Sequence, residues 1–335
     1  MVSLEISDAA DSGWNKRLFE SELGTISQIN ETGEQFTTNN QIPRYVKFLD
    51  STGKIVGQLL MSETPRFQEA PYKKKKLSNK LGKVSGLLKL ANVKTKLYRW
   101  SYGPVIFDKS YSNQVYTALG NYFLTEKSHQ VSGWQHPFHT EGLSGLPKNF
   151  EIVHWSTFVV DLSLSKDELF KNIEKNSGRK NIKRAINKGI EIEEINDENL
   201  YDYFTLLNAD KPDRGGSNSN FNDFKKLWNS MKPLGRTGFV AKINSKILSG
   251  LTFSYISGHI IEGAVARSNS DKENSFYSQD LIRWKIIEWG VDNKMKWYNL
   301  AGFNPDLQTS KEEGIFRYKK KWGGQRFDYY GIKRL

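Results

Sequence analysis

Residues 238–266 read GFVAKINSKILSGLTFSYISGHIIEGAVA, a pattern of short apolar runs separated by turn residues. Apolar runs of this length bounded by Asn-Ser and Ser-Gly pairs are typical of antiparallel strands joined by tight turns. The segment therefore predicts a three-stranded meander. The expected strands are 239–241, 247–255 and 260–266, and the expected turns are 244–245 and 257–258.

A helix and a fourth strand are expected to follow this meander. After a polar loop over 267–275, Ile282, Ile286 and Trp289 recur at the spacing of one helical face, which predicts a helix over about 276–292. The apolar run 297–300 then predicts a strand. The second half of the chain thus has the order β-β-β-α-β.

The first half sketches the same order of elements without obvious identity of residues. A short Asp-Ser-Thr-Gly turn divides its first two strands, and a long aromatic-rich segment follows. The repeat predicts two related α/β halves. Its expected elements are strands over 44–49, 54–62, 98–107 and 130–134, and a helix over 111–127.

The start of the second half carries a clear helix signal. Ser165 with Glu168 forms the pattern of a capping box, which satisfies free amides at a helix N-terminus. The helix is expected to continue to about residue 187 and to stop at Gly189, with a strand over 156–162 before it. Residues 190–193 alternate as an edge strand.

Composition limits the possible environments and chemistries. The chain has 335 residues, enough for two domains, and carries a net charge of +12, which favours polyanionic partners. It has no cysteine, which excludes disulfides, thiolate metal sites and a cysteine nucleophile. No apolar run is long enough to span a membrane, and no signal peptide is recognisable, so a cytoplasmic protein is expected.

Four motifs occur in an order that resembles the FemABX-type transferases. The most specific is an aromatic-Lys pair followed by a second aromatic residue and two glycines near the C-terminus. A basic helix, a Gly-Pro strand and a Gly-containing loop accompany it. The four are GIFRYKKKWGG (314–324), SGRKNIKRAINKGIEI (177–192), RWSYGPVIFD (99–108) and WYNLAGFNP (297–305).

The resemblance implies an α/β fold with mixed sheets, built as two tandem GNAT-like domains. The first would span 1–150 with a basic insert at 71–97, and the second 151–325, with the C-terminal strand 326–335 returning to the first. The family's reaction is transfer of an aminoacyl group from tRNA to an amine of a muramyl-peptide precursor. The short run between 195 and 236 resembles the compact members that have no helical arm.

Several departures concern the acceptor. Residues 30–40 contain neither the Trp nor the Lys that helps to hold the precursor in compact members of the family. A strand that is rich in Tyr in those members reads Ile-Ile-Glu-Gly at 260–263, and the loop around Arg214 has no obvious second Arg. The resemblance therefore predicts the fold more strongly than the muramyl substrate.

The resemblance also implies the catalytic residues. Transfer from an activated ester needs an aligned amine and a stabilised oxyanion more than covalent help from the protein. Lys319 would serve the oxyanion or the donor phosphate, and Tyr318 would contact the donor adenosine. The alternative is that the three lysines at 319–321 are a solvated strand end. The general base stays open among Asp306, Glu313 and Asp280.

Basic residues form two further candidate sites. Arg179, Lys183 and Arg184 lie with Lys180 on the expected basic helix, where they could bind substrate phosphates together with Arg214, or could be a solvated face. Between residues 73 and 96 the chain has nine lysines, including Lys73, Lys74, Lys75 and Lys76. This insert could form an amphipathic helix on an anionic membrane, bind tRNA, or be plain solvated chain.

Other ligand classes are not indicated. His136 and His139 have no third ligand nearby, so no metal is expected. The segment 267–275, where a GNAT enzyme would hold acetyl-CoA through glycines, contains none. No cofactor is therefore expected, and an aminoacyl donor is favoured over an acyl-CoA.

The preferred interpretation is an aminoacyltransferase. It would use charged tRNA to acylate an envelope precursor, which could be lipid-linked, in the cytoplasm or at the inner face of the membrane. One alternative is an N-acyltransferase that uses a CoA or carrier thioester on an amino sugar of an exopolysaccharide. A third is a non-catalytic protein that binds tRNA or membrane.

Overall fold

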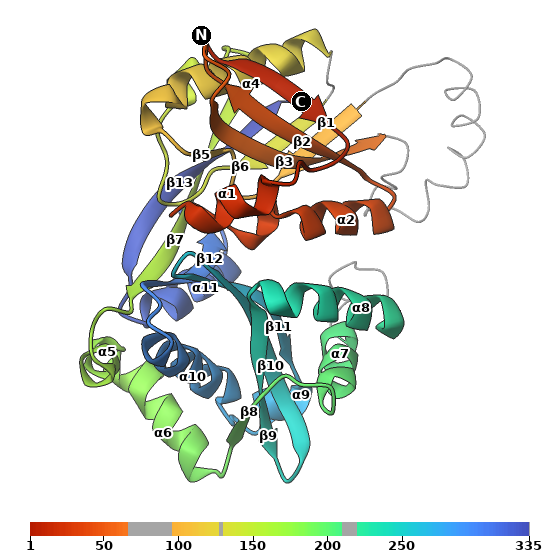
Figure 1. The fold of residues 1–335 in the computed structure, drawn as a ribbon. Coiled ribbons are helices and arrows are strands. Elements are labelled where there is room, and N and C mark those ends of the chain that lie inside the picture. Colours follow the sequence, from red (N-terminus) through yellow and green to blue (C-terminus); the bar gives the residue numbers. More distant parts are fainter. Residues whose placement is uncertain (66–95, 127–129, 210–219, 335) are drawn as a thin grey trace, which may run out of the picture. The chain divides into compact units, whose positions relative to one another are not determined.

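The computed structural model describes residues 1–65, 96–126, 130–209 and 220–334. The chain divides into two compact units, each with its own strands, helices and core (Figure 1). Unit 1 comprises 1–154 and 329–335, and unit 2 comprises 155–328. Both units carry helices on a mixed sheet, which confirms the α/β class predicted from the sequence.

Unit 1 is built on a sheet with the strand order β1-β2-β3-β4-β6-β13, and β5 pairs with β3. Neighbouring strands are antiparallel except β4 and β6, which are parallel. The C-terminal residues of β13 pair with β6, as Gly331 opposite Trp134 shows. The strands are β1 (Ser3–Ser7), β2 (Ile42–Leu49), β3 (Ile55–Pro65), β4 (Lys96–Trp100), β5 (Val105–Ile106), β6 (Gln130–Trp134) and β13 (Gln325–Arg334).

Three α-helices among the described residues pack on this sheet. The largest, α4, buries Val115, Leu119 and Phe123 at helical spacing against the strands, because these three positions share one face. The N-terminal helices were not predicted from the sequence. The helices are α1 (Trp14–Glu20), α2 (Asn30–Thr38) and α4 (Ser112–Thr125).

Unit 2 repeats the plan with the strand order β7-β12-β11-β10-β9-β8. Its one parallel pair is β11 with β12, and the edge strand β8 pairs only with β9 among the described strands. The main core lies between this sheet and α10. The strands are β7 (Glu151–Asp161), β8 (Glu191–Glu194), β9 (Arg236–Ile243), β10 (Lys246–Ile256), β11 (His259–Arg267) and β12 (Trp297–Phe303).

Helices cover both faces of this second sheet (Figure 1). On one face α10 packs with Ile282 and Ile286 in the main core, and on the other α7 packs with Tyr203 in a smaller core. Within the described residues, no helix is long and apolar enough to cross a bilayer. The helices are α5 (Lys166–Asn172), α6 (Lys180–Asn187), α7 (Leu200–Ala209), α8 (Phe221–Met231), α9 (Asn269–Glu273), α10 (Ser278–Asp292) and α11 (Ser310–Lys320).

The meander predicted over 238–266 is confirmed as β9, β10 and β11, with positive φ at Asn244, Ser245 and Ser257 in its two turns. The predicted helix and final strand are confirmed as α10 and β12. The prediction of a polar loop over 267–275 is wrong in one respect, because this segment contains the short helix α9.

Two long elements predicted from the sequence are broken. The strand expected over 98–107 ends at Trp100 and resumes as β5, because Pro104 has no N–H for a ladder and Tyr102 has a positive φ. The helix expected from Ser165 to 187 has the predicted capping box but ends at Asn172.

A turn of π-helix, Lys175–Arg179, separates α5 from α6. The Glu174 carboxylate causes this break, because it accepts hydrogen bonds from the backbone N–H groups of Asn176, at 2.9 Å, and Ser177, at 2.5 Å. The N–H of Glu174 itself donates to the carbonyl of Lys321, 2.8 Å away. These bonds replace the helical bonds that would have joined α5 to α6.

Candidate functional site

The sheet of unit 2 opens between its two parallel strands. β11 and β12 pair over three residues only, ending with Ile261 opposite Asn299. Beyond that point β11 continues beside β10 and β12 beside β7, so the two parallel strands separate. Ligands of α/β sheets bind at the carboxyl ends of parallel strands. This opening is therefore the candidate site of unit 2.

Helix α11 places Lys319 against the carbonyls of β12 just past this point of separation. Its Nζ donates hydrogen bonds to the backbone oxygens of Leu300 and, at 2.9 Å, of Ala301. No carboxylate among the described residues lies within ion-pair distance of it. An ammonium group has three donors, so one donor and the positive charge are left for a ligand.

A bulge in β12 aims these two carbonyls at Lys319. The register against β7 slips by one residue between Asn299 and Gly302, and Ala301 has a φ of 62°. The Asn299 side-chain oxygen accepts from the N–H of Ala301 at 2.9 Å, and the Thr157 hydroxyl donates to that same oxygen at 2.6 Å. A non-glycine residue in this conformation costs about 1–3 kcal/mol and persists where the surroundings enforce it.

Burial changes the ionisation of Lys319. Desolvation lowers the pKa of its ammonium group to about 8, the nearby Glu262 carboxylate acts in the opposite direction, and Arg283 lowers it further. The group is therefore mainly charged at neutral pH and loses its proton just above it. A cation in this state can stabilise an anion and is only weakly hydrated.

A buried polar cluster stands beside Lys319, and we call Glu262, Arg283, Tyr298 and Tyr318 the Glu262 network. Arg283 binds the Glu262 carboxylate through two bonds of 2.7 and 3.0 Å, and the side chains of both are over nine-tenths buried. The Tyr298 hydroxyl donates to the same carboxylate at 2.5 Å. Such bidentate pairs are geometrically specific.

Tyr318 joins this network through Arg283. The Arg283 guanidinium donates to the Tyr318 hydroxyl at 2.8 Å and lies 4.8 Å from the ring centre. Burial raises the pKa of the Tyr318 hydroxyl well above its ordinary value. Tyr318 is thus a neutral, oriented phenol next to Lys319.

Lys321 was not predicted as a site residue and is the most buried of the three consecutive lysines. Its Nζ binds the Asp280 carboxylate at 2.6 Å and contacts the carbonyl of Ser177 at 3.3 Å. Asn181 donates to the other Asp280 oxygen at 2.9 Å. Asp280, one of the proposed bases, therefore has both oxygens occupied, and the strand-end alternative is wrong because residues 319–320 end a helix.

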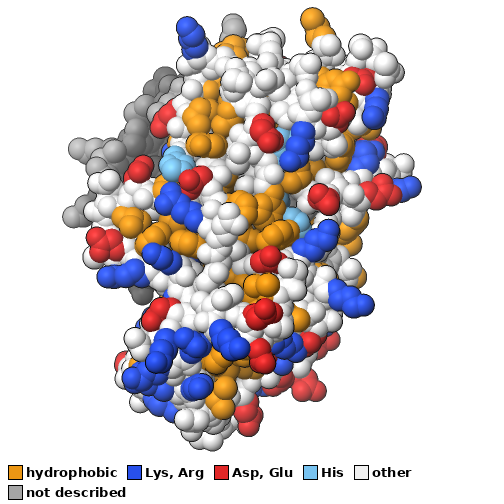
Figure 2. Space-filling view, turned by 90° about the vertical axis from the view of Figure 1, so that its left-hand side faces the viewer, with side chains coloured by type: hydrophobic (Ala, Val, Ile, Leu, Met, Phe, Trp, Pro, Cys, Tyr) orange, Lys and Arg blue, Asp and Glu red, His pale blue; other side chains and the backbone are white. Residues whose placement is uncertain are grey.

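The basic residues predicted on the helix form an exposed face. Figure 2 shows Lys and Arg side chains gathered on unit 2, on the side where α5 and α6 lie in Figure 1. Lys183 and Arg184 are exposed on α6, and Arg184 lies 5.6 Å from the ring centre of Tyr277. Arg179 lies in the π-helical turn, and its buried Nε has no hydrogen-bond partner among the described residues.

Within the part of the chain that is described, no hydrogen bond, ion pair or ring contact joins these three basic residues to Tyr318 or Lys319. They therefore lie outside the Glu262 network. Arg214 and the lysines Lys73–Lys76 lie outside the described residues.

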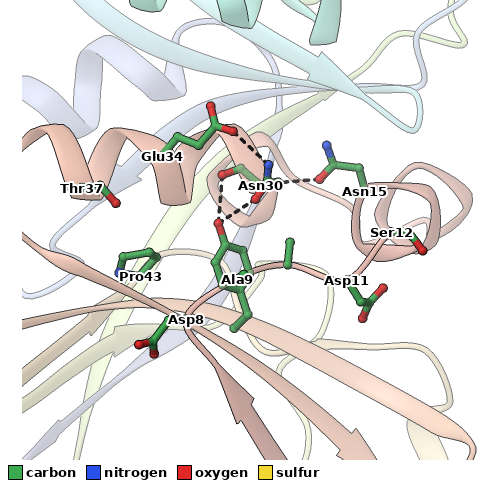
Figure 3. Close-up of a pocket in the computed structure, with 11 residues that line it drawn as sticks. Asp8, Ala9, Asp11, Ser12, Asn15, Asn30, Glu34, Thr37 and Pro43 are labelled. Atoms are coloured by element: carbon green, nitrogen blue, oxygen red, sulfur yellow. Dashed lines mark hydrogen bonds between the residues drawn. The ribbon is translucent and has the colours of Figure 1, made fainter.

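Unit 1 contains a separate polar cavity of about 540 Å³ between its first loop, α2 and β2 (Figure 3). The Tyr45 hydroxyl donates to the Asn30 side-chain oxygen at 2.8 Å, and Glu34 accepts from the Asn30 amide at 3.2 Å. Burial raises the pKa of Tyr45 to about 12. Asp8 and Asp11 also line the cavity, so its carboxylate lining disfavours phosphate ligands.

The Glu262 network could be anticipated from the sequence only in part. Glu262 interrupts the apolar run of β11 and Arg283 lies on the buried face of α10, and a charged residue at such a position signals a partner. The partner could not be identified, because Glu262 and Arg283 meet only once α10 has packed on the sheet.

Comparison with solved structures defines the class of the fold. The structure described as FemX matches with a TM-score of 0.65 at 13% identity, covering 97% of this chain and 96% of that one. L-PGS from Bacillus licheniformis matches at 0.52 and 13%, covering 87% and 84%. A tandem GNAT protein from the clavulanic acid biosynthesis pathway matches at 0.52 and 11%, covering 99% and 98%. The predicted tandem GNAT-like fold is thereby confirmed.

The residues of the site also match a family model at the level of sequence. Residues 262–332 match the model of the FemAB family, and this span begins at Glu262 and contains the whole Glu262 network, Lys319 and Lys321. Together with the fold, the match supports a FemAB-type family member, and the protein is a transferase. No curated protein sequence matches the chain significantly.

Proposed function

We propose that this protein transfers an aminoacyl group from charged tRNA to an amine of a cell-envelope precursor. The observation that carries the proposal is the ammonium of Lys319, held at the opening between β11 and β12 by two neutral carbonyls. An ester carbonyl attacked by an amine develops negative charge on its oxygen. A preorganised cation without a carboxylate partner is suited to stabilise that charge.

The remaining residues receive roles under the same proposal. Tyr318, fixed by Arg283, shapes the pocket for the terminal adenosine of the donor. Arg179, Lys183, Arg184 and Arg214 bind phosphates of the donor or the acceptor, and the Lys73–Lys76 cluster binds tRNA or an anionic membrane surface. The enzyme then works in the cytoplasm, at the inner face of the membrane where lipid-linked precursors are found.

The donor is tested by binding measurements at two salt concentrations. Charged tRNA and acetyl-CoA are titrated into the purified protein, with uncharged tRNA as control. The proposal predicts tRNA binding that weakens steeply with salt, because phosphate contacts release counterions. Saturable acetyl-CoA binding with indifference to tRNA would support the N-acyltransferase alternative instead.

The pH dependence of transfer tests the charge on Lys319. Because the pKa of Lys319 is lowered to about 8, its ammonium form is lost as the pH rises through that value. We expect kcat/KM to fall about tenfold per pH unit above pH 8, with the acidic limb set by the acceptor amine. Lys319→Arg, which keeps its charge at alkaline pH, should lack this alkaline fall. An unchanged alkaline limb in that variant would show that another group titrates.

The basic insert is tested by charge removal without deletion. Replacing all four lysines of Lys73–Lys76 with Gln should weaken binding to tRNA, or to vesicles containing an anionic lipid, on the order of tenfold at low salt. A control variant loses the same charge at four exposed lysines elsewhere. These are Lys16, Lys226, Lys246 and Lys294. Equal loss in both variants, or none in either, would mean that the insert is only solvated chain.

A further inference from the structure

The N-terminus of α10 is the position in unit 2 where a phosphate would be expected. α10 has fifteen residues and follows β11, the strand that borders the opening. Its first turn is fixed to the carboxyl end of β11, because the Gln279 amide donates to the carbonyl of Ala266 at 3.1 Å. Helix N-termini in such positions bind anions through free N–H groups and the helix dipole.

In this protein the side chain of Asp271 occupies the position at the N-terminus of α10 where a phosphate would be expected. The carboxylate of Asp271, from the short helix α9, accepts the backbone N–H of Ser278 at 3.2 Å, at the first residue of α10. Two residues further on, the N–H of Asp280 binds the carbonyl of Tyr277 at 3.0 Å. Asp271 is fully buried, with 0% of its surface exposed.

The negative charge of Asp271 is neutralised by a second side chain of the protein. The Nε of Arg267, the last residue of β11, donates to the second oxygen of Asp271. The backbone also fixes the position of Asp271, because its N–H binds the Ser268 hydroxyl at 3.1 Å and its carbonyl accepts from Phe276 at 3.2 Å. The Asp271 carboxylate thus binds both the Arg267 guanidinium and the N-terminus of α10.

We propose that Asp271 is a built-in anion that excludes the diphosphate of acyl-CoA from the α10 N-terminus and so determines donor specificity. A ligand diphosphate would have to displace a buried carboxylate, or lie against it and be repelled at short range in a medium of low dielectric. A donor that presents no diphosphate at this point is not penalised. An aminoacyl ester of a terminal adenosine is such a donor, so the inference rests on the proposed function and deepens it.

The test compares the wild-type protein with Asp271→Ala, using inorganic pyrophosphate and CoA as probes. Asp271→Ala frees the Ser278 N–H and the Arg267 guanidinium together, and we expect pyrophosphate and CoA to bind at least about tenfold more tightly than to the wild type. Asp271→Asn keeps a side chain of the same shape in place, and its affinity for the two probes should increase less. Glu273→Ala, which removes an exposed charge from the same short helix, should gain nothing.

Hydrogen exchange locates the binding. Pyrophosphate should protect the amides of residues 278–282 in Asp271→Ala and leave them unchanged in the wild type. The proposal is overturned by CoA binding to the wild type that protects these amides, by a folded Asp271→Ala without gain, or by an equal gain in Glu273→Ala. If Asp271→Ala does not fold, Asp271→Ser takes its place, with the same expected gain and the same contradicting outcomes.

The result is independent of the aminoacyl reaction. Binding of pyrophosphate and CoA is measured without tRNA or acceptor. A protein that excludes CoA at α10 but does not transfer aminoacyl groups would refute the proposed function and leave the role of Asp271 standing. A protein that binds CoA there would refute the role of Asp271 directly.

Discussion

Lys319→Ala is expected to lower kcat at least about tenfold while the protein stays folded, because the oxyanion loses a preorganised cation. Burial lowers the pKa of this ammonium, so the folded state holds the charge less favourably than the unfolded chain does, and the charge itself adds little to stability. The melting temperature of the variant shows whether it stays folded.

The adjacent Lys320 supplies the control. Its side chain is exposed at the end of α11 and lies 5.8 Å from the ring centre of Phe316. Lys320→Ala removes the same charge from the same helix turn and should retain most of the activity. Wild-type rates from a folded Lys319→Ala protein, or equal losses in both variants, would remove Lys319 from the mechanism.

Glu262→Ala should produce the largest loss of stability. It leaves the guanidinium of Arg283 buried without a counterion and removes the acceptor of the Tyr298 hydroxyl. Breaking a buried ion pair in this way costs about 3–5 kcal/mol of unfolding free energy. Urea denaturation measures the change.

A surface pair in the same unit provides the comparison. Lys166 and Asp292 lie 2.6 Å apart, with side chains 40% and 59% exposed, and Asp292→Ala should cost no more than about 1 kcal/mol. If Glu262→Ala is as mild as Asp292→Ala, the Glu262 network does not hold the site together.

The fold could be predicted from the sequence where local patterns decide the structure. Alternating apolar runs and turn residues located β9, β10 and β11 because each strand buries one face and each turn needs its own backbone chemistry. The break between α5 and α6 could not be predicted. It depends on the Glu174 carboxylate, which binds the N–H groups of Asn176 and Ser177, and also on the hydrogen bond from the Glu174 N–H to Lys321, a residue far away in the sequence.

The site was predictable only in part for the same reason. Tyr318 and Lys319 could be named because they belong to a short motif with a recognisable spacing. Glu262 and Arg283 lie 21 positions apart, and their pairing depends on how α10 packs against β11. Asp271 shows the limit most clearly, because the absence of glycine in its loop was visible and the carboxylate at the helix end was not.

The most direct test is the mass of the acceptor after a single turnover. Purified protein is mixed with an envelope extract and a mixture of charged tRNAs, and in a parallel reaction with acetyl-CoA. The account predicts acceptor molecules heavier by one amino-acid residue with charged tRNA, far fewer of them with Lys319→Ala, and no change with acetyl-CoA. Acceptors heavier by an acetyl group, with charged tRNA left intact, would contradict it.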